Sequence, residues 1–76
     1  PFNPTTTINF TIPEAGLVSV DVFNVSGQKV ATVASNFMNA GSHSVTWNAS
    51  GFSAGVYFYQ VRFGDSSRTM KMTLLK

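Results

Sequence analysis

The stretch VYFYQVRF, which runs from Val56 to Phe63, is the strongest β-strand signal in the chain. Its residues are mostly β-branched or aromatic, and these residue types favour the extended backbone of a sheet. Because side chains along a strand point alternately to its two faces, one set should face the core: Tyr57, Tyr59, Val61 and Phe63. Val56 and Phe58 are then expected on the outer face. The opposite register stays open, since VYFY is apolar on both faces.

The same alternation continues on both sides of this stretch. Further strand candidates are Thr7–Ile12, Val18–Phe23, Lys29–Ala34, His43–Trp47 and Arg68–Lys76, separated by turns rich in Gly, Pro, Asn and Ser. Their spacing, near the roughly 8–12 residues of antiparallel sandwiches, predicts an all-β fold, a small antiparallel immunoglobulin-like β-sandwich of six to seven strands. Residues expected together in one core are Phe10, Val20, Trp47, Tyr59 and Met72, with Met70 and Leu74 also inward.

Three local features need separate interpretation. Between residues 30 and 37, Val30, Val33, Ala34 and Phe37 also have the spacing of two helical turns, but the many β-branched residues there favour a strand. FMNAGS, from Phe37 to Ser42, is expected to be a loop. Asp21 is expected to point outward from its strand.

Length and composition restrict the possible functions. With 76 residues the chain forms one domain, 1–76, in which Pro1–Pro4 is the end of a preceding linker. There are no cysteines, and the net charge of +2 is too weak a field to indicate nucleic-acid binding. No apolar run reaches the length of a membrane helix. The chain begins at Pro1 without an initiator Met, so we expect it to be part of a longer protein.

No catalytic or cofactor-binding constellation stands out. The three carboxylates, Glu14, Asp21 and Asp65, lie in different turns and strands, and His43 has no partner at metal-ligand spacing. The predictions are therefore no enzymatic activity, no cofactor and no metal. Trp47, Tyr57 and Tyr59 could stack on sugar rings, as in carbohydrate-binding modules, but their shared face with Val45 and Val61 favours a core position.

The residues expected on the outer face of the sheet suggest a surface that binds a partner. Val56 and Phe58 would lie outward on one strand, and Leu75 would lie outward on the last strand beside Lys71. An exposed apolar patch with basic neighbours is typical of a protein interaction site.

Four blocks of sequence carry a resemblance to a known family. They are PFNP (Pro1–Pro4), NVSGQKV (Asn24–Val30), AGSHSVTW (Ala40–Trp47) and SAGVYFYQV (Ser53–Val61), followed by the terminal KMTLLK (Lys71–Lys76). In this order they resemble the type A C-terminal sorting domain of type IX secretion, which is related to the immunoglobulin-like domain of flagellar-hook capping proteins. The loop between Trp47 and Gly55 is shorter than in many members and lacks their Asp-Gly pair.

The resemblance implies a function that involves no catalysis by this chain. In this family the folded domain is the address on an exported bacterial protein: outer-membrane export machinery recognises it, and a sortase typically removes it. The cargo, fused upstream, first crosses the inner membrane by its own signal peptide and ends on the cell surface or released. Matching the family's blocks assigns partner recognition to Gly55, Val56 and Tyr57, and to Lys71 and Lys76; Phe58 and Leu75 join them from the surface argument.

The expected protein is therefore a monomeric secretion and surface-attachment module, whose parent is a secreted hydrolase such as a glycosidase or protease. The alternatives are a carbohydrate-binding accessory module of a polysaccharide-degrading enzyme and a structural spacer.

Overall fold

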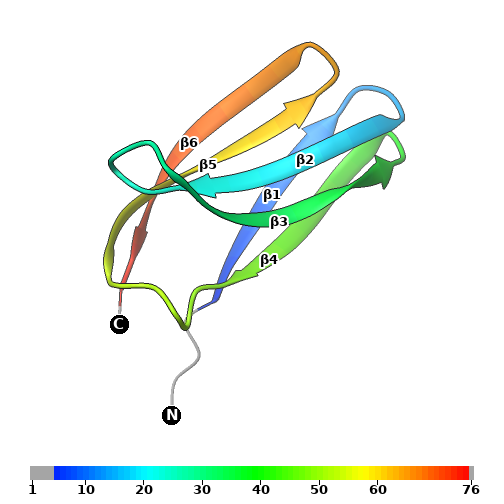
Figure 1. Cartoon of the computed structure of the whole chain (residues 1–76). Helices are drawn as coiled ribbons and strands as arrows, with labels where there is room; N and C mark the ends of the chain where they lie inside the picture. Colours follow the sequence, from blue (N-terminus) through cyan, green and yellow to red (C-terminus); the bar gives the residue numbers. More distant parts are fainter. Residues whose placement is uncertain (1–4, 76) are drawn as a thin grey trace.

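The fold, described for residues 5–75 by a computed structural model, contains strands and turns and no helix in that range (Figure 1). The strands are β1 (Thr5–Ile12), β2 (Gly16–Phe23), β3 (Lys29–Met38), β4 (Gly41–Asn48), β5 (Gly55–Phe63) and β6 (Ser66–Leu74). β1 and β4 form a two-stranded sheet, and β3-β2-β5-β6 is the order of a four-stranded sheet; every pairing is antiparallel. The predicted all-β sandwich is confirmed, with six strands.

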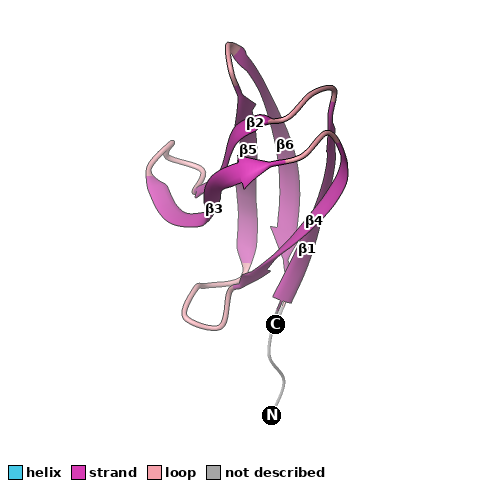
Figure 2. Cartoon of the chain, turned by 90° about the vertical axis from the view of Figure 1, so that its right-hand side faces the viewer, coloured by secondary structure: helices cyan, strands magenta, loops and turns pink. Residues whose placement is uncertain are grey.

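Two clusters of buried residues form the interior. Figure 2 shows the strands of the two sheets that enclose them. One cluster centres on Val22, Trp47 and Leu74, and the other on Ile8, Val18 and Val20. Tyr59 packs against both clusters. The residues predicted to share one core are therefore divided: Val20 and Phe10 belong with the second cluster, whereas Trp47 and Met72 belong with the first.

β3 is a strand in which two residues interrupt the regular pairing with β2. Val20 lies opposite Ala34 but Asp21 lies opposite Thr32, so Val33 has no partner in the register. A second shift, between Val22 and Phe23, leaves out Val30 in the same way. Both extra residues pack on the core, and this arrangement is that of β-bulges, which bend a strand and increase its twist. The strand interpretation of this segment is confirmed.

The loop predicted from Phe37 to Ser42 is wrong, and two residues face the predicted way but differ in burial from what their direction suggests. β3 continues to Met38, so Phe37 and Met38 belong to a strand and the connection to β4 is only Asn39–Ala40. Asp21 is on the outer face but is buried, with 5% of its surface exposed. Met70 is on the inner face, opposite Tyr59, yet 45% of its surface is exposed. The reason for the exposure of Met70 is that neither core cluster reaches the first half of β6.

Candidate functional site

The hairpin of β5 and β6 brings most of the predicted partner residues together. Its register places Gly55 opposite Leu74, Val56 opposite Thr73 and Phe58 opposite Lys71. The hairpin loop is the dipeptide Gly64–Asp65, in which Gly64 has φ 57° and Asp65 has no positive φ. A glycine in the first position of a two-residue loop is typical of a type II′ turn, whose twist matches that of paired strands. This turn fixes the register that pairs Phe58 with Lys71.

The outer face of the four-stranded sheet carries a transverse row of four residues. Phe23 of β2 lies opposite Lys29 of β3 on one side and Phe58 of β5 on the other, and Phe58 lies opposite Lys71 of β6. Two phenylalanines thus lie side by side between two lysines. Together with Val25 and Val56, which are exposed beside this row, these residues are here named the terminal surface. Leu75, directly after β6, is 75% exposed. Lys76 lies outside the described residues.

The turn between β2 and β3 forms one wall of a depression in the terminal surface. This depression, of about 360 Å³, is lined by Phe23, Val25 and Phe58 together with Asn24, Gly27, Gln60 and Thr69. The Oδ1 atom of Asn24 accepts hydrogen bonds from the backbone N–H groups of Ser26 and Gln28, each at 3.0 Å. An Asn side chain that bonds its own turn stabilises it locally, so these bonds stabilise the turn that carries Val25.

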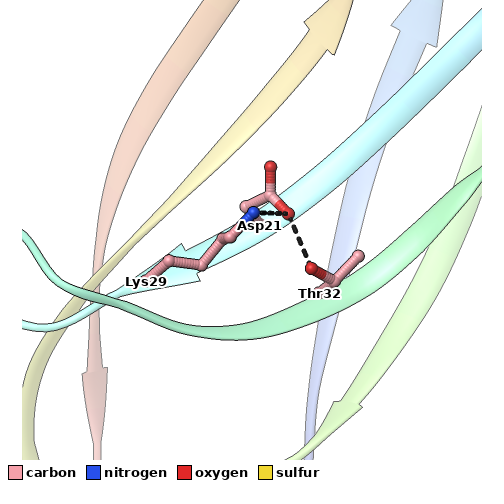
Figure 3. A network of polar contacts seen from close by, with 3 residues as sticks. All are labelled: Asp21, Lys29 and Thr32. Carbon is pink, nitrogen blue, oxygen red and sulfur yellow. Dashed lines mark hydrogen bonds and ion pairs between the residues drawn. The ribbon is translucent and has the colours of Figure 1, made fainter.

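A buried carboxylate, that of Asp21, lies beside one of the two lysines of the terminal surface. Asp21 accepts a hydrogen bond from the hydroxyl of Thr32 at 3.0 Å, and its Oδ1 lies 3.9 Å from Nζ of Lys29 (Figure 3). Asp21 is 7% exposed at its side chain and Lys29 is 56% exposed. One lysine of the row is therefore engaged with Asp21, whereas Lys71, across the two phenylalanines, is exposed.

The Gly-Val-Tyr block has a mainly structural role in this geometry. Tyr57 is only 8% exposed, and its ring contacts Trp47 edge-on with 5.5 Å between centroids. Its hydroxyl donates a hydrogen bond to the carbonyl of Ser53 at 2.8 Å. Gly55, with φ 146°, has a backbone conformation that residues with a Cβ rarely adopt. Tyr57 thus anchors the loop before β5, and Val56 is the member of the block that faces outward.

Sequence reasoning missed Phe23, Val25 and Lys29 as members of this surface. The alternation in VSVDVF places Phe23 on the outer face with Asp21, but it does not show which strand lies beside β2. The row forms because β2 pairs with both β3 and β5. The local sequence pattern does not encode this strand order.

No catalytic arrangement is found among the described residues. They contain no group of three or more His, Asp or Glu side chains that could hold a metal ion. His43 is engaged with the backbone carbonyl of Asn39, at 2.6 Å from Nε2, and its ring contacts that of Phe10. Trp47 and Tyr57 are buried in the core, so their rings are not free to stack on a sugar. No helix long and apolar enough to cross a membrane occurs in the described part of the chain.

Comparison with known proteins gives one result. A family model described as "Secretion system C-terminal sorting domain" matches residues 1–75. No curated protein and no solved structure matches significantly.

Proposed function

The chain belongs to the family of secretion system C-terminal sorting domains, those of type IX secretion, and we propose that its terminal surface is the part that the export machinery recognises. The observation that carries the proposal is the row of Lys29, Phe23, Phe58 and Lys71 on one face of the folded domain. Aromatic residues such as Phe are enriched at the centres of protein interfaces, whereas charged residues lie mainly at the rim, and the two lysines lie at the two ends of this row.

Membership of the family makes the domain a signal for export to the cell surface or beyond. The finer steps are part of the proposal: a protein fused upstream is the cargo, it carries a signal peptide for the inner membrane, and a sortase removes the domain after export. The catalysis belongs to the sortase. The parent is proposed to be a secreted hydrolase, and the exported domain is proposed to act as a monomer.

The end of β6 is proposed as a second element of recognition. Among the strands that the structure describes, β6 is outermost in its sheet and pairs with β5 alone, so its other edge can bond to a strand of a receptor. Lys71, Leu75 and Lys76 would then present a basic and apolar end to that receptor. Gly55 and Tyr57 support this end indirectly, since they hold the loop that precedes β5.

An export assay tests the proposal. The chain Pro1–Lys76 is fused behind a reporter with a periplasmic signal peptide, in a host with type IX machinery, and the surface-exposed reporter is measured. We expect the fusion to place the reporter on the cell surface and the reporter alone to stay in the periplasm. A fusion that stays in the periplasm although it is folded would contradict the proposed function.

Variants of the chain end separate recognition from stability. Deleting Lys71–Lys76 should abolish export, but it also removes the buried Leu74, and a fully buried side chain of this size contributes about 1.5–3 kcal/mol. Lys76→Glu should leave stability within about 0.5 kcal/mol, as surface substitutions usually do, and should reduce export. Equal export of the wild type, Lys76→Glu and the deletion would show that the export machinery does not recognise the end of the chain.

No observation favours the carbohydrate-binding alternative, because two of its three candidate rings are buried. Calorimetric titration with xylan and cellulose should show no binding. A micromolar dissociation constant for either polysaccharide would require a binding function besides sorting.

A further inference from the structure

The two sheets of the sandwich differ in width. Neighbouring strands lie about 4.8 Å apart, so the two strands β1 and β4 cannot cover the full inner face of four strands. Ile8 and Ile12 of β1 pack with residues of β2 and β5. From β6, the core clusters include only Met72 and Leu74, in the second half of the strand. The first half of β6 therefore has no strand of the other sheet packed on it.

The uncovered region is a groove of about 620 Å³, here named the strand groove. One wall is the edge of β1 from Asn9 to Ile12, continued by Pro13 and Glu14. The opposite wall is β6 with its turn, from Gly64 to Arg68, and Met70. Between them lie inner-face residues of β5, namely Tyr59, Val61 and Phe63. The base of the groove is thus apolar, and this explains why Met70 is 45% exposed although it is on the inner face.

Both walls of the strand groove are edges of strands. Among the described residues, the backbone N–H and C=O groups along these edges have no neighbouring strand to bond to. β1 pairs with β4 only, and β6 pairs with β5 only, in the described sheets. Unpaired edges offer backbone N–H and C=O groups for a further strand. An extended peptide could bond to such an edge with its backbone and place every second side chain in the groove.

We propose that the strand groove binds an extended segment of another polypeptide, which pairs with β1 and extends the smaller sheet to three strands. The resulting arrangement of four strands on three is that of constant-type immunoglobulin domains. The lined edge of β1, from Asn9 to Ile12, spans about 14 Å at roughly 3.4 Å per residue, and Pro13 and Glu14 of the following turn continue the wall for two more residues. The segment is therefore about six residues long, with alternate apolar side chains.

The charges around the strand groove give the segment a preferred direction. Glu14 and Asp65 both line the groove, in the turns that follow β1 and β5, where β1 ends. Arg68 lines the groove too and also lines, with Asn9, the adjoining depression. An antiparallel strand starts where β1 ends, so its first residue lies near the two carboxylates. The complementary segment is basic at its N-terminal end and acidic about five residues later.

Two synthetic peptides test both the site and the direction. One is acetyl-Lys-Val-Thr-Val-Thr-Glu-amide, and the other has Lys and Glu exchanged. Each is titrated into the ¹⁵N-labelled chain and followed by amide chemical shifts. We expect the first peptide to shift the amides of Asn9–Ile12 and of Met70, and to bind about fivefold more tightly than the second, a difference that two solvent-exposed ion pairs can provide.

Substitutions in and away from the strand groove provide the control. Met70→Lys places a charge on the apolar base and should weaken binding of the first peptide at least about tenfold. Phe37→Lys adds the same charge at an exposed position that does not line the groove, and it should bind as the wild type does. Well-dispersed amide spectra show that each variant is folded.

Three outcomes of the peptide titrations would overturn the inference. They are the absence of shifts in β1 with either peptide at millimolar concentration, equal binding by Met70→Lys, and tighter binding of the charge-exchanged peptide, which would exclude the proposed direction. Self-association of the chain that Met70→Lys abolishes would identify the occupant as a second copy and also overturn the proposed partner. The test needs no export machinery, so it can fail while the proposed function stands.

Discussion

At the scale of single residues, Trp47 and Tyr57 determine how the loop between β4 and β5 is held. Their rings meet edge-on, and Phe52 from the loop contacts both, with centroid distances of 5.1 Å to Trp47 and 6.4 Å to Tyr57. Edge-on aromatic pairs add about 0.5–1.5 kcal/mol beyond their buried area. The Gly-Val-Tyr block thus has a structural role. Its glycine adopts a positive φ at the start of β5, and its tyrosine holds the preceding loop.

The substitution Trp47→Ala should be severely destabilising. Trp47 is 5% exposed at the centre of one core cluster, and loss of a buried Trp costs about 3–5 kcal/mol. A chain of 76 residues has a total stability of roughly 4–11 kcal/mol, so much of it would be lost. Urea denaturation measures the change, and a loss below about 1 kcal/mol would contradict the buried position of Trp47.

Substitution of Gly55 tests the backbone role of the block. No atom lies within 4 Å of a Cβ built on Gly55, so any cost of Gly55→Ala arises from its φ of 146°. Backbone strain of this kind costs about 1–3 kcal/mol. Gly51→Ala, in the loop that precedes β5, also has open space and no positive φ, and should change stability by less than about 0.5 kcal/mol. Equal stability of the two variants by thermal denaturation would contradict this assignment.

At the scale of elements, β3 shows what sequence patterns can and cannot predict. A strand with a bulge at Val30 and another at Val33 presents its inward residues at positions 30, 31, 33 and 34, a spacing that resembles the face of a helix. The β-branched residues indicated the correct element, but the bulges follow from the pairing with β2, which no local pattern encodes. Phe37, which has the same helix-like spacing, is 61% exposed and does not belong to these inward residues.

The other elements were predictable because their alternation is regular. The inward residues of β2 follow from period two alone, and Val18, Val20 and Val22 are indeed buried. In β5 the sequence left two registers open, and the burial of Tyr57 decides between them. The candidate site was only half predictable: Val56, Phe58 and Lys71 are on one strand pair, whereas Phe23 and Lys29 join them through the sheet order. The burial of Asp21 likewise depends on its neighbours, Lys29 and Thr32.

The contact between β2 and β3 at Asp21 gives a prediction about these two elements. Thr32→Val keeps a β-branched residue but removes the hydroxyl that donates to the buried carboxylate. A buried acceptor that loses its donor costs about 1–3 kcal/mol, so chemical denaturation should show a loss in this range. Thr46→Val, at an exposed position of β4 with no side-chain partner to lose in the described contacts, should be close to neutral. A Thr32→Val variant as stable as the wild type would show that the hydrogen bond does not matter.

At the scale of the whole molecule, the two proposed binding regions are separate. The terminal surface lies on the outer face of the four-stranded sheet, toward the C-terminal end of β6, and the strand groove lies on the inner face near the start of β6. Glu14 and Asp65 line the strand groove, whereas Lys71 is on the terminal surface. A sorting domain with this layout could engage the export machinery and an extended segment at the same time.

The most direct test of the account is the export efficiency of two charge-reversal variants in the reporter fusion. Lys71 and Arg62 are both exposed cations on the outer face of the four-stranded sheet, but only Lys71 is in the row with Phe23 and Phe58. Lys71→Glu and Arg62→Glu change the net charge equally, and thermal denaturation establishes that both remain folded. We expect Lys71→Glu to reduce the reporter on the cell surface severely and Arg62→Glu to leave it near the wild-type level. Unchanged export by Lys71→Glu, or an equal loss in both variants, would contradict recognition through the terminal surface.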